Sequence, residues 1–431
     1  MAGLVRRLTV AAAAWGASLA AVLAAPLAAE TVAIRAGSVI ADADSAPTGP
    51  ATILVSDGRI VAITPGHGPL AADREIDLAG KTVLPGLIDL HTHLSGDPSG
   101  EFWRAAVDPG EWYTLIAAKN ARITALAGFT TVRDLGSRTD QVTQSLRRAT
   151  ATGVVPGPRI VTSARTISIV GGHGDVNGFV EHVNDALASD YTCTGPVECA
   201  ETVRKASKYG ADLIKITATG GVLSQQGRGL EAHFTDAEMK AIVDTAETLG
   251  LKVAAHAHGA RGIEAAARAG VHTIEHGTYL DEQAARVMRE NGTVLVPTLM
   301  ALKGVSEGLD KGIYTPVVEE KIRSVVPLMT TLVSRAREYG VEVAFGTDAG
   351  VFPHGRNGEE FALMVGQGMT SREALASATT VAARILGLES EIGRLAAGYS
   401  ADLIAVTGNP LDDVRVLEKV DFVMVRGRVI E

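Results

Sequence analysis

The sequence predicts an α/β protein: a TIM (β/α)8 barrel with a small composite β-sandwich domain built from both ends of the chain. Eight apolar, strand-like runs alternate with alanine-rich helical segments between about residues 84 and 388. Several helical segments end in glycine just before the next run, and β-rich stretches flank the whole region. Repeated strand–helix units punctuated by glycine are typical of parallel α/β folds. The length of 431 residues suits one large barrel and a smaller module.

Residues 1–29 have the layout of a secretory signal peptide. Arg6 and Arg7 precede an apolar run rich in alanine, and small residues lead to Ala29, after which we expect cleavage. A membrane anchor is the alternative, because the run approaches the roughly 20 residues that span a bilayer. Its alanines make it weakly hydrophobic, however, and no basic cluster follows it. We therefore expect an exported protein, periplasmic or secreted, by the general or the twin-arginine route, with no membrane span after the signal is removed.

The β-rich ends, residues 30–83 and 393–431, are expected to form the composite β-sandwich domain. In the first of them, Ser56-Asp57-Gly58-Arg59 separates two β-branched runs and predicts a hairpin turn. The second end has the same pattern of short apolar runs broken by glycine and proline. Both ends together are long enough for one small sheet domain.

The barrel is expected to span residues 84–392. An open doubly wound sheet is the alternative, but it would require a phosphate-binding glycine-rich turn that opens a helix. The nearest match, Gly66-His67-Gly68, runs into Pro69. The eight strand-like runs are 84–94, 129–135, 159–164, 213–219, 252–258, 272–277, 293–298 and 343–349.

Composition and cysteine usage limit the partners and the compartment. With 40 Lys+Arg against 49 Asp+Glu and 4% aromatic residues, nucleic acid is not an expected partner. Cys193 and Cys199 either form a disulfide, as an oxidising compartment favours, or remain free thiols. They do not form a zinc knuckle, because no second Cys or His pair lies near them.

Histidines gather at the predicted strand ends, where the active site of a TIM barrel lies. Of the 11 histidines, five fall at the ends of three strands. Residues two apart on a strand share a face, so one strand presents both His91 and His93 to the lumen. Imidazole and carboxylate groups are the ligands that zinc prefers, which predicts a metal site. Its candidate residues are His91, His93, Lys215, His256, His258, His276 and Asp348.

The motifs around these residues resemble the amidohydrolase superfamily, specifically its imidazolonepropionase-like and prolidase-like (Xaa-Pro dipeptidase-like) hydrolases. The resemblance covers nearly the whole mature chain and implies two divalent metal ions, with zinc expected. By that resemblance His91, His93 and Asp348 hold one ion. His256 and His276 hold the second. The matching segments are Pro85-Gly86-Leu87-Ile88-Asp89-Leu90-His91-Thr92-His93, Ile214-Lys215-Ile216, His256-Ala257-His258-Gly259, Ile274-Glu275-His276-Gly277 and Gly346-Thr347-Asp348.

The resemblance further implies that Lys215 carries a carbamate that bridges the two ions. Burial in a barrel lowers the pKa of a lysine, and a neutral amine can take up carbon dioxide. The alternative is an uncarboxylated Lys215 paired with Asp348. In the implied mechanism a metal-bridging hydroxide attacks the carbonyl, while Asp348 accepts its proton and passes it to the leaving nitrogen.

Three further residues are candidate substrate contacts. His256 and His258 share a strand face, and the resemblance places the metal ligand first, which leaves His258 nearer the mouth. His173 lies in a glycine-rich loop after the third strand. Arg228, in the loop after the strand of Lys215, is expected either to bind a substrate carboxylate or to be solvated. Structural roles are expected for His272 and for an Arg133–Asp134 ion pair, and none for His67, His182, His233 and His354.

The sequence therefore predicts an exported binuclear amidohydrolase that hydrolyses the amide bond of dipeptides or N-acyl amino acids, in the manner of a dipeptidase or carboxypeptidase. Alternatives are hydrolysis of another amide-linked amino acid such as ochratoxin, of a lactone or of a cyclic amide. A non-catalytic periplasmic binding protein is a further alternative, disfavoured because it would not need Asp348 as a proton acceptor. The expected partner is a small-molecule substrate, and the expected assembly is a homo-oligomer.

Overall fold

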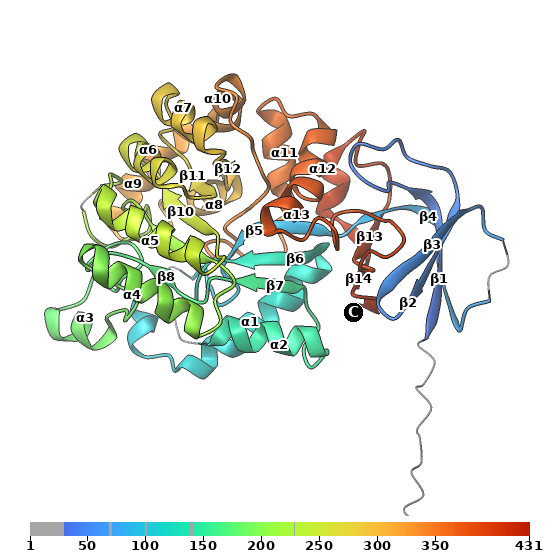
Figure 1. Cartoon of the computed structure of the whole chain (residues 1–431), viewed down its shortest axis with the longest axis horizontal. Coiled ribbons are helices and arrows are strands. Elements are labelled where there is room, and N and C mark those ends of the chain that lie inside the picture. The colour runs from blue at the N-terminus through green and yellow to red at the C-terminus, as the bar shows by residue number, and fades with distance from the viewer. Residues whose placement is uncertain (1–29, 69–70, 100, 138–140, 228) are drawn as a thin grey trace, which may run out of the picture.

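A computed structural model describes residues 30–431 except 69–70, 100, 138–140 and 228. The predicted signal peptide, residues 1–29, and the predicted substrate contact Arg228 lie outside the described residues. Figure 1 shows a sheet formed by the two ends of the chain beside a larger region of strands surrounded by helices. Among the described residues, no helix combines the length and the apolar character needed to cross a bilayer.

The two ends of the chain share one seven-stranded sheet, in the order β15-β14-β13-β4-β1-β2-β3. β1 and β4 are parallel, and β4 pairs antiparallel with β13, which joins the N-terminal and C-terminal parts. The predicted hairpin turn is confirmed: Asp57 and Gly58 both have positive φ, as a two-residue turn between β2 and β3 requires. The strands are β1 (Thr31–Val39), β2 (Ala51–Ser56), β3 (Arg59–Pro65), β4 (Arg74–Pro85), β13 (Leu403–Val406), β14 (Val420–Val425) and β15 (Arg428–Val429).

The larger region contains two parallel sheets with the strand orders β5-β6-β7 and β12-β11-β10-β9-β8. Seven of the eight predicted strand runs contain one of these strands; the short β8 was not predicted. The strands are β5 (Leu87–Thr92), β6 (Phe129–Asp134), β7 (Arg159–Thr162), β8 (Thr166–Ile167), β9 (Ile214–Thr217), β10 (Val253–Ala257), β11 (Thr273–His276) and β12 (Val294–Val296).

The eighth predicted run, residues 343–349, forms no strand. It makes only single parallel bridges, from Val343 to Leu295 in β12 and from Ala349 to Thr92 in β5. Its backbone departs from strand geometry at Asp348, where φ is +63°. This segment therefore lies beside the outer strand of each parallel sheet and places Asp348 between them.

Helices lie outside the parallel strands (Figure 1). The glycines predicted to end helices, Gly128, Gly210, Gly250, Gly270 and Gly340, all have positive φ. The helices are α1 (Gly110–Leu126), α2 (Val142–Thr152), α3 (Glu181–Leu187), α4 (Gly195–Lys208), α5 (Asp236–Thr248), α6 (Ala260–Ala269), α7 (Glu282–Asn291), α8 (Leu299–Ser306), α9 (Pro316–Met329), α10 (Leu332–Glu338), α11 (Glu359–Gly366), α12 (Ser371–Ser377) and α13 (Thr380–Leu386), with 3-10 turns η1 (Phe102–Ala106) and η2 (Val414–Glu418).

A disulfide joins Cys193 to Cys199, as in the first of the two predicted alternatives. Both residues are buried, and Cys199 lies in the first turns of α4. The covalent link therefore fixes the loop that enters this helix.

Candidate metal centre

The predicted site residues converge at the carboxyl ends of the parallel strands. They line a cavity of about 210 Å³. Because the carboxyl ends of parallel strands meet at one edge, side chains far apart in sequence are brought together there. All the predicted site residues within the described part of the chain line this cavity: His91, His93, His173, Lys215, His256, His258, His276 and Asp348.

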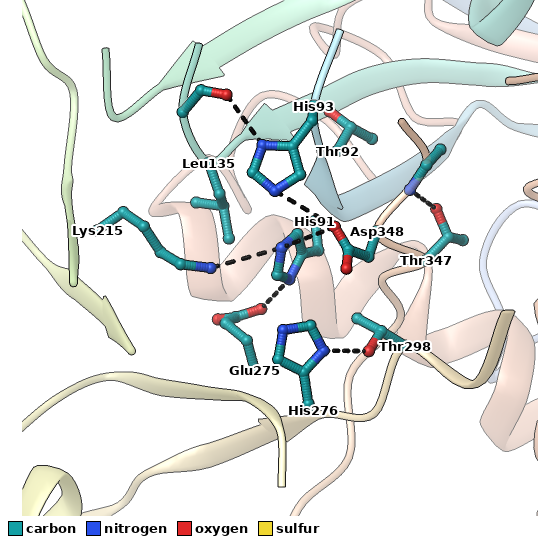
Figure 2. Close-up of polar contacts among 12 residues, drawn as sticks. His91, Thr92, His93, Leu135, Lys215, Glu275, His276, Thr298, Thr347 and Asp348 are labelled. Carbon is teal, nitrogen blue, oxygen red and sulfur yellow. Dashed lines mark hydrogen bonds and ion pairs between the residues drawn. The ribbon is translucent and has the colours of Figure 1, made fainter. Parts of the chain in front are cut away.

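His91, His93 and Asp348 form the first ligand group, with one potential ligand atom of each within 4.8 Å of the others. Nε2 of His91 and Nε2 of His93 each lie 3.3 Å from Oδ1 of Asp348 (Figure 2). The backbone N–H of Asp348 donates to the carbonyl of His91 at 2.7 Å. This bond holds Asp348 in its left-handed conformation, which is strained for a residue with a side chain.

The hydrogen-bond partners of the two rings fix their tautomers. Nδ1 of His91 lies 2.9 Å from a carboxylate oxygen of Glu275, and Nδ1 of His93 lies 2.9 Å from the carbonyl oxygen of Gly136. Both partners only accept, so each Nδ1 carries the proton and each Nε2 presents a lone pair. Both Nε2 atoms lie close to Oδ1 of Asp348, so three lone-pair donors face one another.

A divalent cation fits this arrangement. Among the described residues, the buried Oδ1 of Asp348 has no hydrogen-bond partner. Burial alone would raise the pKa of Asp348, but the neighbouring His91 and His93 hold that pKa well below its usual range. Burial likewise opposes protonation of His93, yet Asp348 raises the pKa of His93 above its usual value. The site therefore attracts positive charge, which a metal ion supplies to all three groups at once.

His256, His258 and His276 form the second ligand group. Nε2 of His256 lies 3.1 Å from the carbonyl oxygen of Gly220, so Nε2 carries the proton and Nδ1 keeps a lone pair. Burial lowers the pKa of all three rings, that of His258 to about 3. They are therefore neutral at pH 7, the state in which histidine binds metal ions.

Threonine hydroxyls hold the other two rings of this group. Nδ1 of His276 lies 2.7 Å from Oγ1 of Thr298 (Figure 2), and Nδ1 of His258 lies 2.7 Å from Oγ1 of Thr278. The hydroxyl of Thr278 donates to Sδ of Met329 at 3.7 Å, so it accepts from His258. The hydroxyl of Thr298 can donate or accept, so it sets the ring plane of His276 without selecting a tautomer.

Lys215 projects from β9 towards the first group, with Nζ 3.4 Å from Nε2 of His91 (Figure 2). Its side chain is buried, and burial lowers its pKa to about 8. A larger fraction of this amine is therefore neutral near pH 7 than for an exposed lysine.

Sequence reasoning missed the partner that orients His91. Glu275 receives a hydrogen bond from His91 through one oxygen and pairs with Nη2 of Arg133 at 2.8 Å through the other. The predicted Arg133–Asp134 ion pair is therefore wrong. Successive side chains of β6 point to opposite faces, so Asp134 instead accepts the backbone N–H of Leu94 at 2.7 Å. Glu275 stands beside His276 in a quoted motif, but the sequence contained no signal for its partner in β5.

His173 lies over the second group, with its ring centroid 4.5 Å from that of His256. Its Nδ1 lies 2.6 Å from Oγ of Ser224. A Cβ on Gly221 would lie 2.2 Å from the same Nδ1, so the ring packs where only glycine leaves room. The loop that carries Gly221 and Ser224 is held by Lys321, whose buried Nζ donates to both of their carbonyl oxygens, at 3.0 Å and 2.5 Å.

His354, which was expected to have no role, supports the turn after β5. Its Nε2 lies 3.2 Å from the carbonyl oxygen of His93, and its Nδ1 lies 2.7 Å from Oγ1 of Thr124. Burial lowers the pKa of His354 to about 4, so the ring is neutral at pH 7. It therefore steadies the backbone of a candidate ligand without contacting the ligand group itself.

Known proteins resemble this chain over most of its length. The chain is 31% identical over 366 residues to ochratoxinase of Aspergillus niger, which covers 78% of this chain and 72% of that protein. The crystal structure of a Xaa-Pro dipeptidase with methionine bound in its active site has 40% identity and a TM-score of 0.86, over 93% of this chain and 100% of that one. A prolidase solved with N-methylphosphonate-L-proline has 32% identity and a TM-score of 0.82, over 93% and 99%. Residues 82–430 match the model of the amidohydrolase family, so the chain belongs to that family, as its motifs predicted.

Proposed function

We propose that this chain is a binuclear metal-dependent amidohydrolase that hydrolyses the amide bond of dipeptides or N-acyl amino acids. The observation that carries the proposal is the convergence of two three-residue ligand groups and a buried lysine on one cavity. The methionine and the proline phosphonate bound by the two similar structures support a substrate built from amino acids. In this proposal the two parallel sheets and residues 343–349 form one TIM barrel, and the seven-stranded sheet belongs to a composite β-sandwich domain.

Two divalent cations, with zinc expected, complete the proposed site. His91, His93 and Asp348 hold one, and His256 and His276 hold the other. When bound, such ions polarise a carbonyl oxygen and lower the pKa of a water molecule.

Lys215 is proposed to supply a bridging carbamate. Its buried amine, with the pKa lowered to about 8, forms an N–C bond to carbon dioxide and releases one proton. The product would be a carbamate anion, whose two oxygens are ligands of a kind that divalent cations bind.

The remaining chemistry is assigned to protein side chains. Asp348 takes the proton of the attacking water and delivers it to the leaving nitrogen. His258 and His173 line the cavity and are proposed to contact the carboxylate or carbonyl of the substrate. Arg228, which lies outside the described residues, is kept as a third proposed contact. Closing these groups into a largely apolar cavity strengthens each polar contact with the substrate.

Export, cleavage after Ala29 and assembly as a homo-oligomer are also part of the proposal. Export of an amidohydrolase of this specificity would place it where peptides and N-acylated amino acids are scavenged.

The test is a panel of dipeptides and N-acyl amino acids, assayed with purified protein whose metal content has been measured. About two metal ions per chain and hydrolysis of at least one amide are expected, with both lost after treatment with a chelator. Ochratoxin belongs in the panel because the chain resembles ochratoxinase. Less than one bound metal ion per chain, together with no amide hydrolysis, would instead favour a non-catalytic binding protein.

A further inference from the structure

The cavity that contains the ligand groups also has an apolar wall. Its polar lining comes mainly from strand ends, whereas the apolar wall comes from α8, the end of α9, the loop after β9 and the segment after Asp348. Among the described residues that line the cavity, Asp348 is the sole carboxylate and Lys215 the sole lysine or arginine. The apolar wall consists of Val222, Leu223, Leu302, Val305, Met329 and Val351.

We propose that the apolar wall binds the side chain of the amino acid released by hydrolysis. The preferred substrates are then N-acyl amino acids and dipeptides whose C-terminal residue is apolar. This inference rests on the proposed function and adds the substrate class to it. A charged side chain would lose its hydration here, and apart from the proposed ligands the described lining offers it no charged partner.

The size of the cavity supports one side chain in this position. A dry apolar cavity of about 150 Å³ holds a benzene molecule. The present cavity, at about 210 Å³, is large enough for a leucine, methionine or phenylalanine side chain next to the reacting bond.

The chemistry of the polar lining indicates the C-terminal residue rather than the N-terminal one. A free ammonium group requires a carboxylate partner, and the carboxylate available in the described lining, Asp348, is a proposed metal ligand. A free carboxylate requires N–H donors, which His173 and His258 can provide. The residue that carries the free carboxylate therefore fits this cavity better.

A second cavity takes the other half of the substrate. It measures about 510 Å³. The two cavities share six lining residues, of which Leu223 and Val351 lie at the edge of the apolar wall: His93, Thr166, His173, Gly174, Leu223 and Val351. An acyl group attached at the ligand groups therefore extends directly into the second cavity. Because the second cavity is larger, we expect it to discriminate less between acyl groups than the first cavity does between amino acid side chains.

The wall is also held rigidly in place. The buried carboxyl group of Glu360 accepts the backbone N–H groups of Leu299 at 2.9 Å and Met300 at 2.6 Å, the first two residues of α8. This contact fixes the helix that carries Leu302 and Val305. A preformed pocket selects side chains more sharply than one that must be ordered by the ligand.

The decisive experiment measures kcat/KM of the metal-loaded full chain for substrates that share one acyl group. N-acetyl derivatives of leucine, methionine and phenylalanine are compared with those of aspartate and lysine. We expect values at least about tenfold higher for the apolar series. A ratio below tenfold, or its reversal, would overturn the inference and leave the proposed hydrolase intact. No hydrolysis of any amide would overturn both.

A pair of matched variants tests the wall itself. Met329→Ala enlarges the pocket and should raise the ratio of kcat/KM for N-acetyl-phenylalanine over N-acetyl-leucine at least about threefold. Met364→Ala removes an equally buried methionine from α11, outside the described lining of the cavity, and should leave that ratio unchanged. An equal change in both variants, or no change in Met329→Ala, contradicts the assignment. Val305→Ala, a smaller truncation of the wall, gives the same test if Met329→Ala does not fold.

Discussion

The two ligand groups are oriented by different chemistry. In the first group, His91 and His93 donate to Glu275 and Gly136, partners that can only accept. In the second group, His256 donates to the carbonyl of Gly220, and the other two rings face threonine hydroxyls. The first group is therefore oriented through a carboxylate and a backbone carbonyl, whereas the second is oriented through a backbone carbonyl and two neutral hydroxyls.

The supports behind these partners differ as well. Glu275 belongs to a buried ion pair with Arg133, so loss of either partner leaves a buried charge without its counter-ion. Thr298 and Gly220 lie instead at the start of α8 and in the loop after β9, segments held by Glu360 and Lys321. Substitutions of the residues that support the first group should therefore cost more activity or metal affinity than substitutions of those that support the second.

The largest effect is expected at the centre of the first group. Asp348→Asn keeps the shape of the side chain but removes its charge and its capacity to accept a proton. We expect kcat on the best amide substrate to fall about 1000-fold, the scale of a lost general base. Circular dichroism checks that the variant is folded, and full activity would rule out Asp348 as the proton acceptor.

Glu275→Gln should be next in magnitude. It removes the negative charge and one of the two oxygens that accept from His91 and Arg133, and leaves the charge of Arg133 buried without a counter-ion. Loss of such an orienting partner costs about 10- to 100-fold in metal affinity or activity. Zinc affinity is measured by competition with a chromogenic chelator.

The matched change in the second group is Thr298→Val. We expect it to lower metal affinity or activity by less than tenfold. The exposed Glu282→Gln serves as a control. Equal losses in Glu275→Gln and Thr298→Val would remove the distinction between the two groups.

Glu360 gives a pH dependence of stability. Burial raises its pKa to about 8, against the lowering effect of the N–H groups of Met300 and Leu299. The folded state therefore keeps a proton that the unfolded state releases above about pH 4.5. The contribution of Glu360 to the free energy of unfolding is full below that pH and falls by about 1.4 kcal/mol per pH unit up to about pH 8.

Urea unfolding between pH 5.5 and 8 tests this contribution. Glu360→Gln should lose about 1.4 kcal/mol less per pH unit than the unmodified chain, because this position no longer titrates. Parallel curves for the two proteins would show that Glu360 is ionised throughout.

The smallest effect is expected at Lys321. Lys321→Met leaves the carbonyl oxygens of Gly221 and Ser224 without their ammonium partner and loosens the loop beneath His173. We expect KM to rise about fivefold, equivalent to about 1 kcal/mol of binding, with kcat and metal content little changed. Lys240→Met, on the exposed face of α5, is the control. An unchanged KM would show that the loop holds its position without Lys321.

The candidate ligand residues could be predicted from the sequence, but the side chains that orient them could not. Strand periodicity put His91 and His93 on one face, and the strand ends brought His256, His276 and Asp348 to the same edge. Which side chains meet across strands depends on stagger and packing, so the contact between Glu275 and His91, 184 residues apart, could not be predicted. For the same reason Arg133 was paired with its neighbour in sequence rather than with Glu275.

The run 343–349 shows a second limit of pattern reading. Its apolar residues resemble a strand, but a single bridge at each end and the left-handed Asp348 replace regular pairing. The local conformation is set by the hydrogen bond from Asp348 to His91 and by Oγ1 of Thr347, which donates to Asp89 at 2.6 Å. A tertiary contact therefore overrides strand propensity at the residue on which the proposed chemistry depends.

The sheet shared by the two ends of the chain has a consequence for biosynthesis. β4 pairs with β13, for example Leu84 with Ile404, so this sheet stays incomplete until the last part of the chain leaves the ribosome. Contacts that close so long a loop form late, and until then one edge of β4 is unpaired. A nascent chain truncated before residue 403 would expose that edge to aggregation or proteolysis. A chain that lacks β13 thus carries an open sheet edge on β4, which the finished sheet covers.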